Sequence, residues 1–328
     1  MLPASEPMGN QSHKATHFLQ FGLKILVVVV AVLFIVYKIT GDEQLSFPAF
    51  IRTLEANRVF SLSNIGILVS LTLLNWFFEI KKWQSLSSLI RKNSLKRTTK
   101  ESLASFTAAI FTPGRLGEYG AKSLFYRKPD RKKVLFLNFL GNFTQLFITV
   151  VFGIIGLLYM VVESRLTLTY FNVLWLTALV VTPFISYFVI RKKQWKIQGY
   201  SFKYLERTVR ALPKALKRRT LAYATCRYLI FTHQFYYFLL VFNLELSYWL
   251  LISAVAAMFL LSSIIPTIMI FDAVIKGGFG VWIFSLLGVN EMVVLVVVLA
   301  VWILNFGTPA LLGSYFVLKF KPPGKAVA

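Results

Sequence analysis

Long apolar stretches separated by basic segments constrain the fold of this chain more than any other feature of its sequence. These stretches cover residues 18–39, 65–80, 134–161, 171–190, 221–242, 248–265 and 292–318. A bilayer core is roughly 30 Å thick, so a helix crosses it with about 20 apolar residues. Because backbone in lipid must satisfy its own hydrogen bonds, each stretch is predicted to be helical. The sequence thus predicts an all-α, polytopic integral membrane bundle of about seven to eight spans.

Composition supports a membrane protein and argues against several other classes. Of the 328 residues, 57% are hydrophobic and 15% are charged, whereas a soluble domain has about 25% charged residues. The single cysteine, Cys226, cannot form an intrachain disulfide, and the three histidines lack clustered carboxylates. No nucleotide-binding glycine loop and no serine-nucleophile motif is present. We therefore expect a single transmembrane domain over residues 1–328, without a soluble domain, catalytic residues, metal or cofactor.

The net charge of +23 is concentrated between the apolar stretches. Lysine and arginine in such segments mark the cytoplasmic side of a membrane protein and attract anionic lipid headgroups. A nucleic-acid-binding protein would instead carry its lysines and arginines on the surface of a soluble domain. We expect a multi-pass protein of the cytoplasmic (inner) membrane with both termini in the cytoplasm, anionic inner-leaflet lipids as partners and no nucleic acid. Residues 18–39 are predicted to form an uncleaved anchor helix. The sequence is also compatible with a homo-oligomer.

A basic segment, residues 191–220, divides the chain into halves that cover approximately residues 18–190 and 221–318 and are expected to be pseudo-repeats. Apolar residues recur at spacings of three and four between Phe202 and Leu216, which predicts an interfacial helix, kinked at Pro213. A short apolar piece, residues 103–111, has basic clusters on both sides and is predicted to form a re-entrant hairpin. For residues 266–289, hydropathy does not decide between one broken crossing and re-entry.

Two interrupted stretches, residues 111–122 and 265–278, share one pattern. In each, a proline ends an apolar segment, and a carboxylate with a lysine four residues later follows. Broken helices at corresponding places in two halves indicate a transporter's binding site. The predicted helix-breaking residues are Pro113, Gly114, Gly117, Pro266 and Gly277.

The first stretch has the chemistry of a phosphate site. A helix that starts after a proline presents free N–H groups, and Arg115 adds a bidentate donor. Glu118 and Lys122 lie one turn apart and can neutralise each other, either at depth or as a solvated pair. Arg227 needs a partner such as Glu118, Asp272 or a lipid phosphate, and interhelical hydrogen bonding is the favoured interpretation of the buried amides. The predicted headgroup or translocation path comprises Arg115, Glu118, Lys122, Gln145, Arg227, Gln234, Asp272 and Lys276.

A family resemblance rests on the segments Asn75–Trp83, Thr112–Tyr119 and Pro266–Gly278, on Gln145, and on Arg227-Tyr228 with Gln234. Here the sequence resembles the flippase-like membrane family named after the transmembrane region of lysylphosphatidylglycerol synthase. The resemblance implies an inner-membrane protein that moves an aminoacylated phospholipid between leaflets. The chain lacks the domain that makes such a lipid, so aminoacyl transfer is not expected. Asp272 and Lys276 also stand where many members have a glycine-rich motif followed by glutamate, which leaves the identity of the lipid open.

The leading hypothesis is a lipid flippase-like transporter whose partner is a phospholipid or another polar lipid. One alternative is a membrane enzyme that uses a lipid-linked donor. It would need clustered carboxylates, and the nearest pair in sequence is Glu118 and Asp130. The other alternative is a non-catalytic scaffold that binds anionic lipid through the segment Arg191–Arg219.

Overall fold

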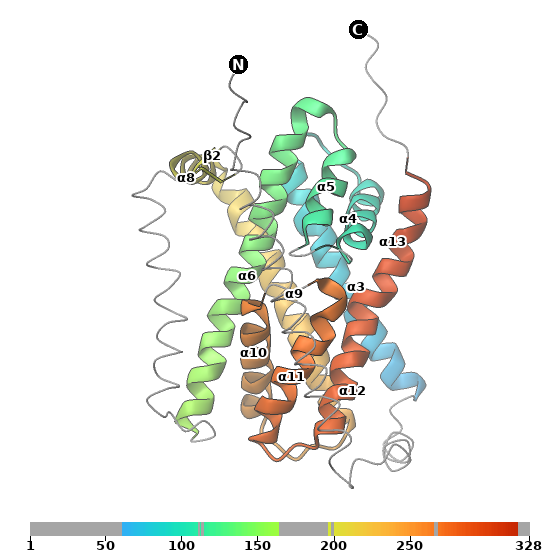
Figure 1. Ribbon diagram of the computed structural model, residues 1–328, viewed down its shortest axis with the longest axis vertical. Helices are drawn as coiled ribbons and strands as arrows, with labels where there is room; N and C mark the ends of the chain where they lie inside the picture. The colour runs from blue at the N-terminus through green and yellow to red at the C-terminus, as the bar shows by residue number, and fades with distance from the viewer. Residues whose placement is uncertain are drawn as a thin grey trace, which may run out of the picture.

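The structure is a computed structural model that describes residues 61–110, 112, 115–163, 196–197, 200–265 and 268–320. The described chain is almost entirely helical, as Figure 1 shows. Three helical stretches are long and apolar enough to cross a membrane: Leu62–Ser87, Lys128–Val162 and Glu291–Leu318. The all-α fold is therefore confirmed, and the three helices are compatible with a membrane protein. The predicted spans at 18–39 and 171–190 lie outside the described residues.

The first group of helices contains two long helices and a short hairpin between them. Its elements are α3 (Leu62–Ser87), α4 (Leu95–Ala109), α5 (Leu116–Leu124), the 3₁₀ turn η1 (Lys128–Asp130) and α6 (Arg131–Val162). The hydroxyls of Ser61 and Ser94 cap the first turns of α3 and α4. Helices α3 and α6 run the length of the molecule, and the α4–α5 hairpin lies in its upper half in Figure 1.

The second group repeats this order. Its elements are α9 (Lys214–Val241), α10 (Tyr248–Ile264), the 3₁₀ turn η2 (Met269–Phe271), α11 (Asp272–Ser285), α12 (Glu291–Trp302), the π-helix η3 (Ile303–Gly307) and α13 (Thr308–Leu318). Helices α12 and α13 continue one another through η3. In Figure 1, α10 and α11 form a hairpin in the lower half of the molecule, so the second interrupted stretch turns back instead of running through.

The two groups run in opposite directions and pack against each other. Helix α3 lies along α9, α6 lies along α10, and α13 lies along α4. Each hairpin thus packs against the last long helix of the other group. Glycines allow these close approaches, because a Cβ at Gly313 would overlap the Leu103 carbonyl oxygen on α4 and one at Gly153 would overlap the Leu260 side chain on α10.

The predicted interfacial helix and the following span differ from the expectation. A short antiparallel strand pair, β1 (Lys196–Ile197) and β2 (Tyr200–Ser201), precedes α8 (Phe202–Ala211). The chain breaks at Pro213 instead of kinking, because proline has no N–H to continue the hydrogen bonds of α8. Helix α9 starts at Lys214 and not at residue 221, so its first turns carry the basic residues Lys217, Arg218 and Arg219.

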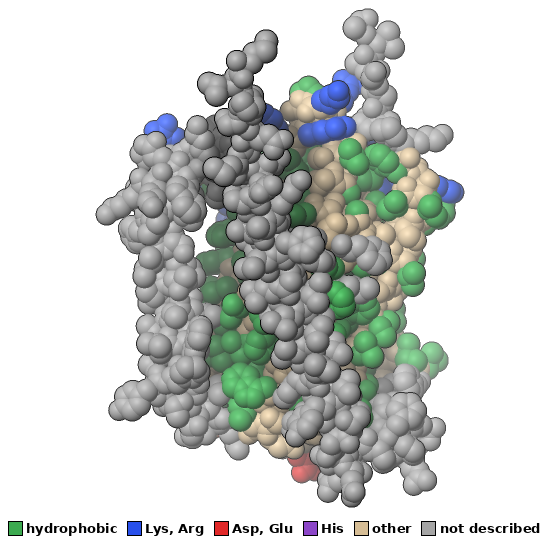
Figure 2. Space-filling model, in the orientation of Figure 1, with side chains coloured by type: hydrophobic (Ala, Val, Ile, Leu, Met, Phe, Trp, Pro, Cys, Tyr) green, Lys and Arg blue, Asp and Glu red, His purple; other side chains and the backbone are tan. Residues whose placement is uncertain are grey.

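Apolar packing fills most of the interior. The largest cluster joins α9, α10, α11 and α12 through buried residues such as Phe235, Leu251, Phe284 and Val294. A smaller cluster around Trp83 joins α3 to α6 at the opposite end. Figure 2 shows lysine and arginine side chains gathered at the upper end of the visible face.

Candidate functional site

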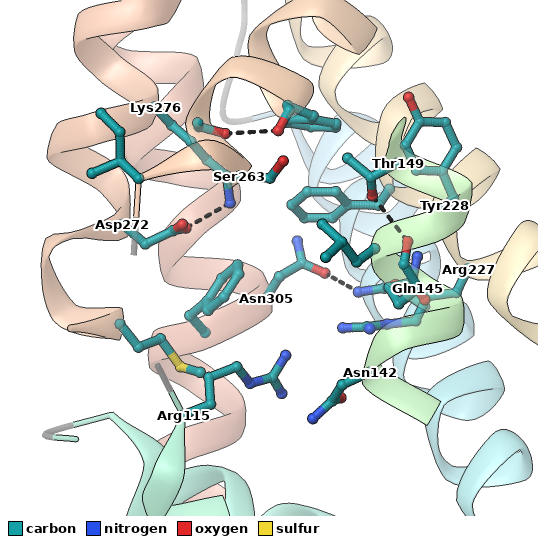
Figure 3. Close-up of a pocket in the computed structure, with 18 of the residues that line it drawn as sticks. Arg115, Asn142, Gln145, Thr149, Arg227, Tyr228, Ser263, Asp272, Lys276 and Asn305 are labelled. Atoms are coloured by element: carbon teal, nitrogen blue, oxygen red, sulfur yellow. Dashed lines mark hydrogen bonds and ion pairs between the residues drawn. The ribbon is translucent and has the colours of Figure 1, made fainter. Parts of the chain in front are cut away.

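A cavity of about 380 Å³ lies where the tips of the two hairpins meet. Side chains from α3, α5, α6, α9, α10, α11 and η3 line it, with Arg115 before α5 and Met269 on η2. This volume falls within the range of small-molecule binding sites, which is roughly 300–1,000 Å³. Figure 3 shows polar and charged side chains facing it from both groups of helices.

Five of the eight residues predicted for the path line this cavity. They are Arg115, Gln145, Arg227, Asp272 and Lys276. The two interrupted stretches are separated by about half the chain, yet both contribute to one cavity. In Figure 3, Arg115 and the Asp272–Lys276 pair come from one side, and Gln145 and Arg227 from the other.

Arg115 is the N-cap residue of α5 and has a φ of 59°. This left-handed conformation costs a residue other than glycine about 1–2 kcal/mol. An Arg115 Nη atom forms an ion pair with an Oε atom of Glu118 at 2.8 Å, and the side chain is 32% exposed. The strained backbone therefore places a guanidinium at the tip of the hairpin, where it faces the cavity.

Glu118 and Lys122 are buried behind Arg115 and do not line the cavity, which corrects their predicted place on the path. The Lys122 ammonium contacts the Glu118 carboxylate at 2.8 Å and donates to the Asn138 amide oxygen at 2.7 Å. The physical reason is the packing of α5, since its face with Glu118 and Lys122 lies against α6. The two residues do neutralise each other at depth, as one of the sequence-based interpretations states.

Arg227 pairs with Glu79 on α3, at 2.9 Å. The predicted partners Glu118 and Asp272 are wrong because the packing of α3 along α9 brings Glu79 to the guanidinium first. Glu79 also contacts Lys82 at 2.7 Å. Like Glu118, this buried carboxylate is shared by one lysine and one cavity-lining arginine.

Asp272 and Lys276 form an ion pair in the first turns of α11. A carboxylate at this position is favoured by the helix dipole. The Lys276 ammonium also lies between 5.0 and 5.7 Å from the ring centroids of Phe231, Phe259 and Phe306. The positive charge of Lys276 is thus held by one carboxylate and three aromatic rings.

Gln234 does not line the cavity either, which corrects its predicted place on the path as well. Its amide donates to the Thr72 hydroxyl at 2.7 Å and accepts from Asn305 at 2.7 Å. Asn305 in turn accepts from Asn75 at 2.7 Å. The interpretation of Gln234 as an interhelical hydrogen-bonding residue is therefore confirmed, and this buried amide chain joins α3, α9 and η3.

The helices break where the sequence predicts, but not every residue predicted to break a helix lies at a break. Pro113, Gly114 and Pro266 lie outside the described residues, although a helix ends before each break and another begins after it. Gly117 and Gly277 lie inside α5 and α11. A helical glycine costs only about 1 kcal/mol, which tertiary packing can offset. Gly117 has its own role, because a Cβ there would overlap the Ala108 carbonyl oxygen on α4.

Sequence reasoning assigned no role in the site to Asn75, Tyr119 or Asn305, which also line the cavity. For Asn75 and Asn305 the signal in the sequence is an amide inside an apolar helix, which is costly unless it is hydrogen-bonded. Asn305 lies in the π-helix η3, and such distortions are frequent at functional sites. Among the described residues, no group of three His, Cys, Asp or Glu side chains is placed to hold a metal ion.

Comparisons of the chain with protein-family models, with curated proteins and with solved structures give no match. The geometry of the cavity therefore carries the functional argument, and the family resemblance stays a prediction.

Proposed function

We propose that this protein moves a polar lipid between the two leaflets of a membrane and that the cavity holds the lipid headgroup. The observation that carries the proposal is a charged cavity within an apolar helical bundle, at the meeting point of two hairpins. Ionisable groups inside a membrane bundle are costly and in general mark ion or substrate pathways.

The arrangement of the helices supports transport. A long helix, a hairpin and a second long helix occur twice, in opposite directions. Inverted repeats with broken helices at their interface are typical of transporters that expose one site alternately to either side. In this proposal, α4–α5 and α10–α11 are re-entrant hairpins that enter the membrane from opposite faces.

The orientation follows from charge. Between Tyr228 and Leu318 the sequence contains one lysine, Lys276, and no arginine, whereas lysines and arginines crowd the loops at the end of the α4–α5 hairpin. The positive-inside rule assigns that end of the molecule to the cytoplasmic side of an inner membrane.

The headgroup phosphate would bind at Arg115 and at the start of α5. Arginine presents a planar fork of donors that matches phosphate, and the N-terminus of a helix favours negative charge. Arg227 would contact the same headgroup from the opposite wall, while Asn142 and Gln145 on α6 offer neutral polar contacts. The acyl chains would stay in lipid along the apolar outer faces of the helices.

The enzyme alternative has less support. Glu118 is paired with two cations and Asp130 does not line the cavity, so these carboxylates form no metal or base site. Part of the segment proposed for a scaffold, Arg191–Trp195, lies outside the described residues.

The test is a leaflet-exchange assay in liposomes with a phospholipid that is fluorescent on its acyl chain. Changing Arg115 and Arg227 together to alanine should lower the exchange rate at least about tenfold, because contacts of a buried charge are worth roughly 2–5 kcal/mol. Glu118 and Glu79 keep Lys122 and Lys82 as partners in this variant, so the fold should persist. Arg218→Ala, an exposed arginine on the same helix as Arg227, is the matched control. Unchanged exchange in the double variant would reject the site.

A further inference from the structure

The charges around the cavity are unequal. Among the described residues that line it, three side chains are cationic, Arg115, Arg227 and Lys276, and Asp272 is the one carboxylate. Behind them, Glu79 and Glu118 are each shared with a buried lysine. Two positive charges thus remain in excess within this cluster.

The excess charge lies on the two arginines. Each carboxylate that they contact is already paired with Lys82 or Lys122. The Nε atoms of Arg115 and Arg227 are buried and form no hydrogen bond. A buried charge is stable only when it is paired and hydrogen-bonded. Because each guanidinium shares its one carboxylate with a lysine, the two arginines together can accept further negative charge.

A substrate with a positive group would need a place in the cavity that stabilises this group. A side chain of the protein already occupies such a place. A carboxylate and three aromatic faces are the chemistry that recognises an ammonium ion. In this protein Asp272 with Phe231, Phe259 and Phe306 surrounds the Lys276 ammonium. A second ammonium brought there by a headgroup would meet a like charge.

We propose that the lipid recognised by this cavity has an anionic headgroup without an ammonium group, and that Lys276 sets this specificity by occupying the ammonium position. The proposal rests on the proposed function and narrows its substrate class. It also departs from the aminoacylated lipid that the family resemblance implies, since that headgroup carries an additional ammonium.

A binding experiment tests the specificity without requiring transport. The purified protein in detergent is titrated with phosphatidylglycerol, phosphatidylethanolamine and phosphatidylcholine of identical acyl chains, and thermal stabilisation and native mass spectrometry report binding. We expect phosphatidylglycerol to bind at least about tenfold more tightly than either ammonium-bearing lipid. Inorganic phosphate is a parallel probe, and stabilisation by it at equal concentration would indicate a free-anion site and overturn the lipid assignment.

Lys276→Met keeps most of the apolar side chain and removes the charged Nζ atom that lies near the three rings. This variant should bind phosphatidylethanolamine or phosphatidylcholine about tenfold better than the wild-type protein does, because the aromatic faces and Asp272 become available. Asp272→Asn combined with Lys276→Met removes the carboxylate as well and should lose this gain. Lys132→Met, at an exposed lysine outside the cavity, is the matched control.

Three results overturn the proposal: equal binding of phosphatidylglycerol and phosphatidylethanolamine by the wild-type protein, an unchanged ratio in folded Lys276→Met, or the same gain in the double variant. The comparison of phosphatidylglycerol with phosphatidylethanolamine binding by the wild-type protein tests the proposed specificity even where a variant does not fold. Selective binding of phosphatidylglycerol without leaflet exchange would reject the transport function and leave the specificity standing.

Discussion

At the scale of single residues, buried carboxylates hold the helices together by accepting from several donors. Glu101 on α4 is fully buried and accepts from the Trp83 indole at 2.8 Å, the Tyr126 hydroxyl at 2.8 Å and the Arg97 guanidinium at 2.9 Å. Burial, together with the charge of Glu101, raises the pKa of Tyr126, so the phenol keeps its proton and donates. This centre fixes the base of the α4–α5 hairpin beside α3.

Glu101→Gln should therefore destabilise the protein, by about 2–4 kcal/mol. A neutral amide offers one acceptor atom where three donors converge, and its NH₂ group would face another donor. The melting temperature of the detergent-solubilised protein measures the loss. Glu206→Gln, which removes the partner of the exposed Arg210, should change stability by less than about 1 kcal/mol. Equal effects of the two substitutions would contradict this role of Glu101.

At the scale of secondary-structure elements, the sequence predicts the helices and their breaks better than their directions. In the sequence, a proline predicts each break because it cannot continue a helix, and the spacing of Glu118 and Lys122 predicts their ion pair. The contact of Arg227 with Glu79 joins residues far apart in the chain, and no local spacing encodes it. Hydropathy likewise cannot distinguish a broken crossing from a hairpin, because both bury the same apolar residues.

Close helix contacts give a prediction at this scale. Gly313→Ala should destabilise the protein, because a Cβ would overlap the Leu103 carbonyl oxygen and the Thr107 hydroxyl on α4, and overpacking costs typically about 1–3 kcal/mol. Gly66→Ala is the control, since nothing lies within 4 Å of the added atom and alanine is the better helix former. Thermal unfolding in detergent separates them: a Gly313→Ala protein as stable as Gly66→Ala would show that α13 can move away from α4 at little cost.

At the scale of the whole molecule, the sequence predicts that two interrupted stretches share one site, and both do line one cavity. Each stretch combines a helix-breaking proline with a carboxylate and a lysine, and an apolar region tolerates such charges only when they are paired. Glu118, Lys122 and Gln234 nevertheless face neighbouring helices instead of the cavity. Which face of a helix points inward depends on packing partners that only the fold supplies.

The distribution of charge over the whole molecule predicts its orientation, and cysteine labelling can measure it. In a Cys226→Ala background, Lys132→Cys marks the basic end, and Glu245→Cys marks the loop between α9 and α10 at the other end; both positions are exposed. A membrane-impermeant maleimide should label Glu245→Cys in intact cells and Lys132→Cys only after permeabilisation, because lysine and arginine loops remain on the cytoplasmic side. The reverse pattern would invert the assignment. If both positions were labelled from outside, the two ends of the molecule would lie on the same side of the membrane. The two hairpins could then not enter the membrane from opposite sides.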